Sequence, residues 1–264
     1  MSKSMNISAE HHLALATGAG RGIGRAIAMR LAGQGIPVVL VARSSEEVTA
    51  VRQEITNAGG RAYACPCDIT SSEEVAALAA DITQDLGPLT LLVNNAGIAP
   101  SMKLEDTSDE VWRSTFSVNV DGPFYLLRAF LPAMREAKQT SHVISIASTA
   151  AQQGYRFTAA YTASKHAMLG LMRAATEELF ATPILFSTLC PGFTRTSLIE
   201  ASIAKQLERG KTRAEAEAAF GKMNREGRLI EPEEIAETVL RLYTTNGLTS
   251  GGVYDAAGTP VSAA

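Results

Sequence analysis

Short apolar segments, rich in β-branched residues, alternate with helical stretches along the whole of this chain. Strands that are buried on both faces read as continuous apolar runs, and a repeated strand–helix order is typical of a parallel sheet. The sequence therefore predicts a single-domain α/β fold, with a doubly wound parallel sheet of about seven strands and helices on both faces. The expected strands are Leu13–Thr17, Pro37–Ala42, Arg61–Cys65, Leu89–Asn94, His142–Ala147, Ile184–Cys190 and Gly252–Asp255.

Capping residues mark several helix starts. A Ser or Thr hydroxyl can accept a hydrogen bond from the backbone three residues later, where an acidic residue completes the cap, and proline suits the first turn. The expected starts are Ser44 with Glu47, Thr70 with Glu73, Thr107 with Glu110, and Pro232 inside a helix that runs toward Tyr243.

The ligand site of a doubly wound sheet lies at the carboxyl ends of its strands. The residues expected at these ends are Thr17, Ala42, Asp68, Asn94, Ser148 and Pro191. Motifs that lie far apart in the sequence are thus expected to meet in one crevice.

A glycine-rich turn, Thr17–Gly24, lies between the first apolar run and a periodic helical stretch. Such a turn lets backbone N–H groups and a helix N-terminus approach a pyrophosphate. Because the strand and the helix are both in place, the motif predicts a dinucleotide-binding turn.

Tyr161 and Lys165 are four residues apart, which places them on the same face of a helix. A nearby ammonium group favours the phenolate, so Lys165 is expected to lower the pKa of Tyr161 from its ordinary value of about 10. Ser148, at a strand end, is expected to hold the oxygen that exchanges the proton. The three residues predict a general acid/base site.

Together these motifs resemble those of the short-chain dehydrogenase/reductase family, over a span from about Leu13 to about Gly258. The matching residues, in the family's order, are Thr17–Gly24, Asp68, Asn94–Gly97, Asn119, Ser148, Tyr161, Lys165 and Pro191–Gly192. The resemblance implies a polar tail at residues 1–12 and one Rossmann-like catalytic domain at residues 13–264. It also implies an NAD(P)-dependent oxidoreductase that interconverts a ketone and a secondary alcohol.

The resemblance assigns catalytic roles to four residues. Tyr161 would exchange a proton with the carbonyl oxygen, and Lys165 would lower the Tyr161 pKa and bind the nicotinamide ribose. Ser148 would orient the carbonyl, and Asn119 would hold a water that connects Lys165 to solvent. The implied cofactor-binding residues are Gly18, Gly20, Arg21, Gly22, Ile23, Gly24, Arg43, Ser44, Asp68, Ile69, Asn95, Ala96, Gly97, Tyr161, Lys165, Pro191, Gly192, Thr194 and Thr196.

The residues after the second expected strand bear on cofactor choice. An acidic residue there would bind the adenosine ribose hydroxyls and repel a 2′-phosphate, but the chain has Ala42 and Arg43, with Arg21 in the glycine turn. Two guanidinium groups suit a phosphate dianion. The sequence therefore favours NADP(H), with NAD(H) as the alternative if Arg43 only stacks on adenine and Arg21 is solvated.

The 193–228 segment interrupts the alternation with two charged helical stretches, around Thr196–Glu208 and Thr212–Met223. In the resembled family this position holds the substrate-binding lid. The alternative is a solvated helical hairpin that does not contact ligand.

The span around the same segment looks like that of 3-oxoacyl-thioester reductases and 3-hydroxyacyl-CoA dehydrogenases. Its basic residues would attract the phosphates of a thioester carrier, or they pair with Glu208, Glu215 and Glu217 on a solvated face. These residues are Arg195, Lys205, Arg209, Lys211 and Arg213.

Three other functions remain open at the level of the sequence. The substrate could be another small or cyclic ketone, a sugar or a polyol, or the chain could be a non-catalytic cofactor-binding regulator. The intact Asn119, Ser148, Tyr161 and Lys165 argue against the regulator. An epimerase or dehydratase of the extended branch is disfavoured by the glycine turn and by the chain length.

Composition narrows the partners and the location. The net charge is −3 with mixed signs, which argues against nucleic acid. The segment Met1–Glu10 lacks an apolar signal core and the apolar runs are too short to span a membrane, so a cytoplasmic protein is expected. A homotetramer or homodimer is expected from the resemblance. The segment Asp255–Gly258 departs from a more usual Asp-Gly-Gly and could alter subunit packing.

Cysteines and histidines show no metal-binding or disulfide pattern, so no metal is expected. Cys65 and Cys67 are expected to pack on one strand face, and Cys190 is expected to be buried. His166 is expected to pack rather than to act as a base.

Overall fold

The computed structural model describes residues 12–137 and 139–261, and within them the strands form one seven-stranded sheet in the order β3-β2-β1-β4-β5-β6-β7. All neighbouring strands are parallel. The strands are β1 (Ala14–Thr17), β2 (Val38–Ala42), β3 (Ala62–Pro66), β4 (Leu91–Asn94), β5 (Ser141–Ile146), β6 (Ile184–Leu189) and β7 (Gly252–Tyr254). The order reverses between β1 and β4, which confirms the predicted doubly wound sheet and opens a crevice there.

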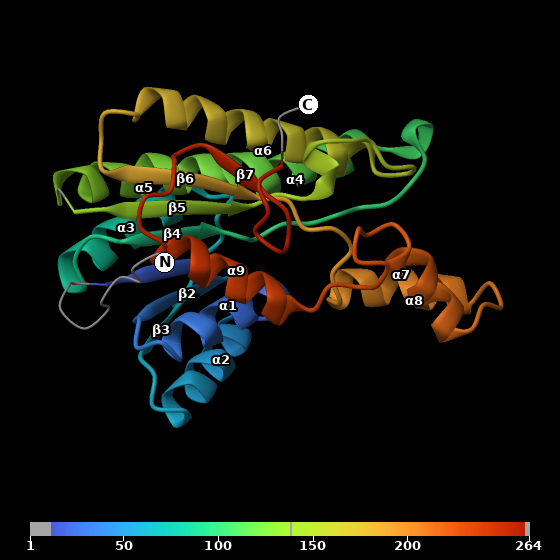
Figure 1. Cartoon of the computed structure of the whole chain (residues 1–264), viewed down its shortest axis with the longest axis horizontal. Helices are drawn as coiled ribbons and strands as arrows, with labels where there is room; N and C mark the ends of the chain where they lie inside the picture. The colour runs from blue at the N-terminus through green and yellow to red at the C-terminus, as the bar shows by residue number, and fades with distance from the viewer. Residues whose placement is uncertain (1–11, 138, 262–264) are drawn as a thin grey trace.

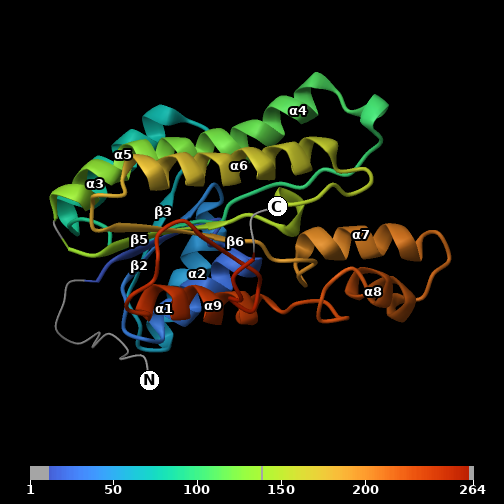
Figure 2. The ribbon, with the colours of Figure 1, turned by 45° about the horizontal axis from the view of Figure 1, so that its top comes forward.

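The helices cover both faces of the sheet. On one face lie α1, α2 and α9, and on the other lie α3, α4, α5 and α6 (Figures 1 and 2). Their bounds are α1 (Gly22–Ala32), α2 (Ser45–Asn57), α3 (Ser72–Asp85), α4 (Asp109–Phe116), α5 (Gly122–Glu136), α6 (Ala159–Glu178), α7 (Ser197–Leu207), α8 (Arg213–Gly221) and α9 (Pro232–Thr244).

One large hydrophobic core lies on each side of the sheet. Alternate side chains of a strand point to opposite faces. In β2, Val38 and Leu40 contact the core beneath α1, α2 and α9, whereas Val39 and Val41 contact the core beneath α3, α5 and α6. Each fully buried side chain of this kind contributes roughly 1.5–3 kcal/mol. Both faces of the strand therefore need apolar residues, which is why the strands read as continuous apolar runs.

Two of the predicted helix starts are wrong by one residue. Ser44 caps α2 as predicted, but the caps of α3 and α4 are Ser71 and Ser108, whose hydroxyls accept from the backbone three residues on. The hydroxyls of Thr70 and Thr107 donate instead to acceptors upstream, 2.8 and 3.0 Å away. The capping hydroxyl is thus supplied by the serine that follows each threonine.

The 193–228 segment extends from the body at the carboxyl end of β6 and carries α7 and α8 (Figures 1 and 2). Its helices lie where the sequence predicts them. Ile203, Ala216 and Leu229 form a small apolar core between them. At its base, Thr194 forms a parallel β-bridge with Ile230, so the segment leaves and returns to the body at one place.

Among the described residues, no helix is long and apolar enough to cross a membrane. The predicted tail at residues 1–12 lies almost wholly outside the described part of the chain.

Candidate active site

The glycine turn joins β1 to α1 in a backbone conformation that side chains would block. Gly18 has a φ of +64°, in the left-handed region that favours glycine. A Cβ on Gly24 would lie 2.2 Å from the carbonyl oxygen of Gly18, so the helix starts in contact with the turn. Within the described residues, no side chain caps the N-terminus of α1. Its first N–H groups are therefore open to an anionic ligand.

Thr17 and Asn95 hold this turn against the segment that follows β4. The Thr17 hydroxyl accepts from the backbone N–H groups of Asn95 and Ala96 at 3.0 and 3.1 Å, and it donates to the carbonyl oxygen of Val93. The Asn95 amide donates to the Thr17 carbonyl oxygen at 2.8 Å. The Asn95 side chain thus holds the glycine turn against the segment that follows β4.

Asn119 lies in a π-helical turn, Ser117–Asp121, between α4 and α5. Its amide accepts from Ile98 N at 2.9 Å and donates to Ile98 O and to the Ser164 hydroxyl, both at 2.9 Å. The π turn adds a residue to the helix, a feature frequent at functional sites. The sequence did not predict this turn, because it depends on contacts with a distant loop.

Gly97 brings Asn119 and Lys165 together. A Cβ on Gly97 would lie 3.2 Å from the Asn119 side-chain oxygen and 3.5 Å from the Lys165 ammonium nitrogen. The ammonium group donates to the Ile146 carbonyl oxygen at 3.0 Å. Lys165, in α6, therefore lies beside Asn119 and the loop after β4, as predicted for one shared site.

Burial lowers the pKa of Lys165 to about 8. Desolvation disfavours the charged ammonium in the interior of the protein. The same effect acts on Tyr161 in the opposite sense, because there the charged form is the phenolate.

The predicted lowering of the Tyr161 pKa is wrong. Burial raises the pKa of Tyr161, and a hydrogen bond with the Ser148 hydroxyl offsets only part of the rise. The Lys165 ammonium lies 5.8 Å from the centroid of the Tyr161 ring and is directed at a backbone carbonyl. Desolvation therefore outweighs the charge that the spacing had suggested.

Ser148 follows β5 and begins a 3-10 turn at Thr149–Ala151. Its hydroxyl accepts from Ala150 N at 3.1 Å, and Thr149 N donates to the carbonyl oxygen of Pro191 at 2.9 Å. The end of β5 is thereby joined to the Pro191–Gly192 pair that follows β6. The structure brings these predicted residues together.

Asp68 and Ile69 face inward more than the resemblance implies. One Asp68 carboxylate oxygen accepts from both the backbone and the hydroxyl of Thr70. Ile69 is buried in the core, where a Cβ on Gly122 would lie 2.6 Å from its side chain. Their roles toward an adenine ring would rest on backbone atoms and on the remaining carboxylate oxygen.

Arg21, in the glycine turn before α1, and Arg43, after β2, both lie on the surface. The Arg21 guanidinium is 3.5 Å from the Glu47 carboxylate, and Ser44 caps α2 through Glu47 N. Arg43 is exposed beside the half-buried Ala42. Thus one of the two predicted phosphate ligands already has an acidic neighbour.

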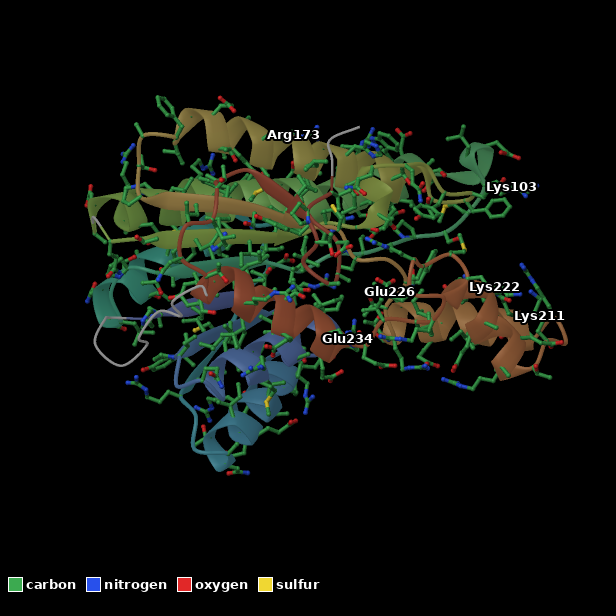
Figure 3. All side chains as sticks on the ribbon, viewed as in Figure 1. Lys103, Arg173, Lys211, Lys222, Glu226 and Glu234 are labelled. Atoms are coloured by element: carbon green, nitrogen blue, oxygen red, sulfur yellow. The ribbon has the colours of Figure 1, made fainter. Side chains whose placement is uncertain are left out.

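The basic residues of the 193–228 segment are partly neutralised. Arg195 pairs with Glu217 and Glu231, and Arg213 pairs with Glu200 and Glu217, at 2.7–3.0 Å. The expected rim of free positive charge is reduced accordingly. Lys211 and Lys222 extend outward from the segment, and Lys103 lies across from them near α4 (Figure 3).

Aromatic side chains lie near Tyr161. Tyr155 donates to the Thr149 hydroxyl at 2.8 Å, and its ring meets that of Phe193 edge-on with centroids 5.8 Å apart. Phe157 has a φ of +67°, a strained conformation for a bulky residue. Its carbonyl oxygen accepts from Met102 N at 2.9 Å, which joins the two loops that flank the site.

A cavity of about 130 Å³ lies elsewhere, at the amino ends of β4 and β5. Thr90, Ser141 and Tyr243 are among its lining residues. It is at the opposite end of the sheet from Tyr161.

The cysteines and His166 have no place in this site chemistry. Cys65 and Cys67 pack in one core, as predicted, and burial raises the pKa of Cys190 to about 11. His166 is exposed, with a ring nitrogen 2.9 Å from the Thr162 carbonyl oxygen, so the predicted packing role is wrong. Among the described residues, no group of three or more His, Cys, Asp or Glu could hold a metal ion.

The sequence of this chain is similar to those of known proteins over most of its length. Residues 12–207 match the family model of short chain dehydrogenases. A putative ketoacyl reductase of Streptomyces coelicolor is 34% identical over 88% of this chain and 90% of that protein.

Two solved structures share the fold. One is a tryptophan variant of the actinorhodin polyketide ketoreductase with NADPH, with a TM-score of 0.87 and 32% identity over 94% of this chain and 96% of that one. The other is a putative NAD(P)-dependent gluconate 5-dehydrogenase from Beutenbergia cavernae with bound NADP, with a TM-score of 0.85 and 33% identity over 95% and 97%.

Proposed function

The chain belongs to the short-chain dehydrogenase family, and we propose that it reduces a ketone to a secondary alcohol with NADPH, with Tyr161 as the general acid. One observation carries the proposal: the Tyr161 phenol, the Ser148 hydroxyl, the Lys165 ammonium and the Asn119 amide meet beside the glycine turn. An enzyme of this family that had lost its chemistry would have no need to keep all four.

The residues present fit a dinucleotide. Glycines leave room at Gly18, Gly24 and Gly97, and the uncapped start of α1 among the described residues suits a diphosphate. Thr194 and Thr196 would hold the cofactor from the other side, because Thr196 lies 3.4 Å from where a Gly22 Cβ would be. Bound NADPH would supply the hydride.

The chain's own residues supply the proton. Tyr161 donates its phenolic proton to the carbonyl oxygen as the carbonyl carbon accepts the hydride, which leaves an alcohol and a phenolate. Ser148 donates a hydrogen bond to the same oxygen. Lys165 would return a proton to the phenolate and would itself be reprotonated from solvent through a water held by Asn119. Burial raises the pKa of Tyr161, so the phenol is protonated at neutral pH and has a proton to donate.

The acid/base role is tested by Tyr161→Phe, which keeps the ring and removes only the proton donor. We expect kcat for ketone reduction to fall at least about 100-fold while NADPH affinity changes little. The measurement is steady-state turnover beside a fluorescence titration with NADPH. A variant with near wild-type kcat would remove Tyr161 from the mechanism.

The preference for NADPH over NADH is supported by the exposed Arg43 after Ala42 and by the NADPH and NADP bound in the two structural neighbours. Removal of a charge-assisted phosphate contact weakens binding by roughly ten- to a hundred-fold. Arg43→Ala combined with Ala42→Asp should erase or reverse the ratio of the two dissociation constants. Equal affinity of the wild type for both cofactors would contradict this choice.

For the substrate we propose a 3-oxoacyl thioester, on the similarity to ketoacyl reductases. The ion pairs of Arg195 and Arg213 leave less positive charge for a phosphate-bearing carrier than the sequence suggested. A cyclic ketone is the second candidate, favoured by the Tyr155 and Phe193 rings, which meet edge-on where the segment between Ser148 and Tyr161 contacts the start of the 193–228 segment.

A substrate panel separates these candidates. It contains acetoacetyl-CoA, its β-ketoester analogue and a cyclic ketone, each with NADPH and NADH. The thioester should have the highest kcat/KM, by a margin that shrinks as salt screens the remaining charge. A clear preference for the ketoester or the cyclic ketone at low salt would reject the thioester and leave NADPH-dependent ketone reduction in place.

A further inference from the structure

Asn224, between α8 and α9, makes three hydrogen bonds that none of the sequence motifs suggests. Its side-chain oxygen accepts from Phe193 N at 2.7 Å, and its amide nitrogen donates to Phe193 O and to Arg228 O, both at 2.8 Å. An asparagine amide has one oxygen acceptor and two N–H donors, and all of these groups are used here. The side chain is 8% exposed, so water cannot readily replace these partners.

These bonds join the two ends of the 193–228 segment. Phe193 begins the segment and Arg228 ends it. Beside them, Ile230 N donates to Phe193 O and Arg195 N donates to Ile230 O, so the backbone there already forms a short parallel pair. The Asn224 side chain adds hydrogen bonds beside this backbone pair, to Phe193 on one side and to Arg228 on the other. Glu226 and Glu234, on either side of Arg228, lie at the junction of the segment with α9 (Figure 3).

The same side chain determines what can stand at Gly192. A Cβ on Gly192 would lie 2.2 Å from the Asn224 side-chain oxygen, far inside van der Waals contact. Gly192 is among the residues expected to contact the cofactor. In this structure Asn224 by itself leaves no room for a side chain at Gly192.

The backbone that Asn224 fixes leads directly to the glycine turn. From Phe193 it passes through the buried Thr194 to Thr196, whose methyl group lies 3.4 Å from the position of a Cβ on Gly22. A shift at Phe193 would therefore move Thr194 and Thr196 relative to the turn.

We propose that Asn224 is a positioning residue for the cofactor: its amide holds the Gly192–Thr196 backbone against the glycine turn, and Gly192 must be glycine because Asn224 fills the space beside it. This inference rests on the proposed function, since it assumes that NADPH binds between these two segments.

The test compares Asn224→Ala and Asn224→Asp with Met223→Ala, a matched control at an exposed neighbour. For each full-length variant, NADPH affinity, kcat, KM and the melting temperature are measured. Loss of buried hydrogen bonds should weaken NADPH binding by about tenfold or more in both Asn224 variants, with kcat at saturating NADPH within about threefold of wild type. The control should match wild type.

Asn224→Asp adds a pH signature. Aspartate keeps the acceptor for Phe193 N but places a carboxylate against the carbonyl oxygens of Phe193 and Arg228. Protonation restores one donor, so the loss of affinity relative to wild type should shrink between about pH 8 and about pH 5.5. Wild-type affinity of Asn224→Asp at pH 8, where the carboxylate has no donor, would show that the two donor bonds do not matter for binding.

A double-mutant cycle tests the Gly192 contact. Gly192→Ala should weaken NADPH binding strongly in the wild-type background and much less in Asn224→Ala, because the alanine methyl then has space. An equal effect in both backgrounds would show that Gly192 is required by the cofactor and would overturn the inference.

Two further outcomes are decisive. A fall in melting temperature with unchanged NADPH affinity in both Asn224 variants would make Asn224 merely structural and would overturn its positioning role. If the wild type binds no NADPH and reduces no ketone, the proposed function fails. Amide hydrogen exchange at Phe193 and Ile230 then still reports whether Asn224 holds the two ends of the segment together. Faster exchange in Asn224→Ala, but not in Met223→Ala, would support this role of Asn224. Unchanged exchange would reject it.

Discussion

His142 in β5 is the residue whose ionisation is expected to affect stability most clearly. It is buried, its ring nitrogen lies 2.9 Å from the Ser187 hydroxyl, and burial lowers its pKa to about 4 from 6.5. The unfolded chain therefore binds a proton below about pH 6.5 that the folded protein refuses until about pH 4. Its contribution is complete above pH 6.5 and is lost as the pH falls through this window.

The expected loss from His142 alone is about 3 kcal/mol between those two pH values. His142→Gln keeps a polar partner for Ser187 and removes the titration, so the free energy of unfolding should fall less steeply with acid. Urea unfolding at a series of pH values measures the slope. Identical slopes in the two proteins would show that His142 is not the group responsible.

The buried ammonium group of Lys165 is expected to lower the free energy of unfolding. Its pKa of about 8, against 10.5 for an ordinary lysine, means that the folded protein holds the ammonium at a cost of about 3 kcal/mol at neutral pH. Lys165→Met fills a similar volume without charge. We expect the free energy of unfolding to rise by roughly 1–2 kcal/mol, after the loss of the bond to Ile146 O is allowed for.

Under the proposed function the same variant should lose ketone reduction, because Lys165 would serve both Tyr161 and the nicotinamide ribose. Lys222→Met, on the exposed surface, is the control and should change neither quantity. Denaturant unfolding and turnover are measured together. A Lys165→Met protein less stable than wild type would show that the bond to Ile146 outweighs the desolvation of the ammonium.

At the scale of the elements, the join between β1 and α1 is fixed by contact rather than by helix propensity. A Cβ on Gly24 would lie 2.2 Å from Gly18 O, whereas nothing lies within 4 Å of a Cβ on Gly170 in α6. Gly24→Ala should destabilise by roughly 1–3 kcal/mol and weaken NADPH binding. Gly170→Ala should stabilise by roughly 0.5–1 kcal/mol and leave binding unchanged.

Thermal unfolding and NADPH titration of the two variants provide the comparison. Each adds one methyl group to a helical glycine, so any difference between them arises from the surroundings. Similar melting temperatures would contradict the close contact at the glycine turn.

At the scale of the whole molecule, the two ends of the 193–228 segment meet at the Thr194–Ile230 bridge, and Thr196 there faces the glycine turn. A ligand that contacts both should restrain the segment and stabilise the fold, by about 2.7 kcal/mol at a hundred times its dissociation constant. We expect NADPH to slow proteolysis within α7 and α8, and to do so more than NADH at equal concentration. Unchanged cleavage with bound NADPH would show that the segment does not respond to the cofactor.

The expected homotetramer or homodimer stays a prediction.

The sequence alone determined the fold class and the order of the elements, and it predicted a set of site residues that stays a prediction. Strand and helix periodicity is local, so the strands and the helices α7 and α8 could be placed from neighbouring residues. The glycine turn and the Tyr161–Lys165 spacing are local too. Parallel strands then bring residues as distant as Thr17 and Ser148 to one edge, which made their convergence predictable before any side chain was placed.

Only the tertiary structure decided the electrostatics and the supporting contacts. Whether Tyr161 gains or loses acidity depends on how much water burial removes, and that is set by elements far away in the sequence. The ion pair between Arg195 and Glu231 joins residues 36 positions apart in the sequence, and the hydrogen bond between Phe193 and Asn224 joins residues 31 positions apart. No sequence motif marks either contact. Periodicity records which face of an element is buried, but pair contacts of this kind arise only when separate elements pack together.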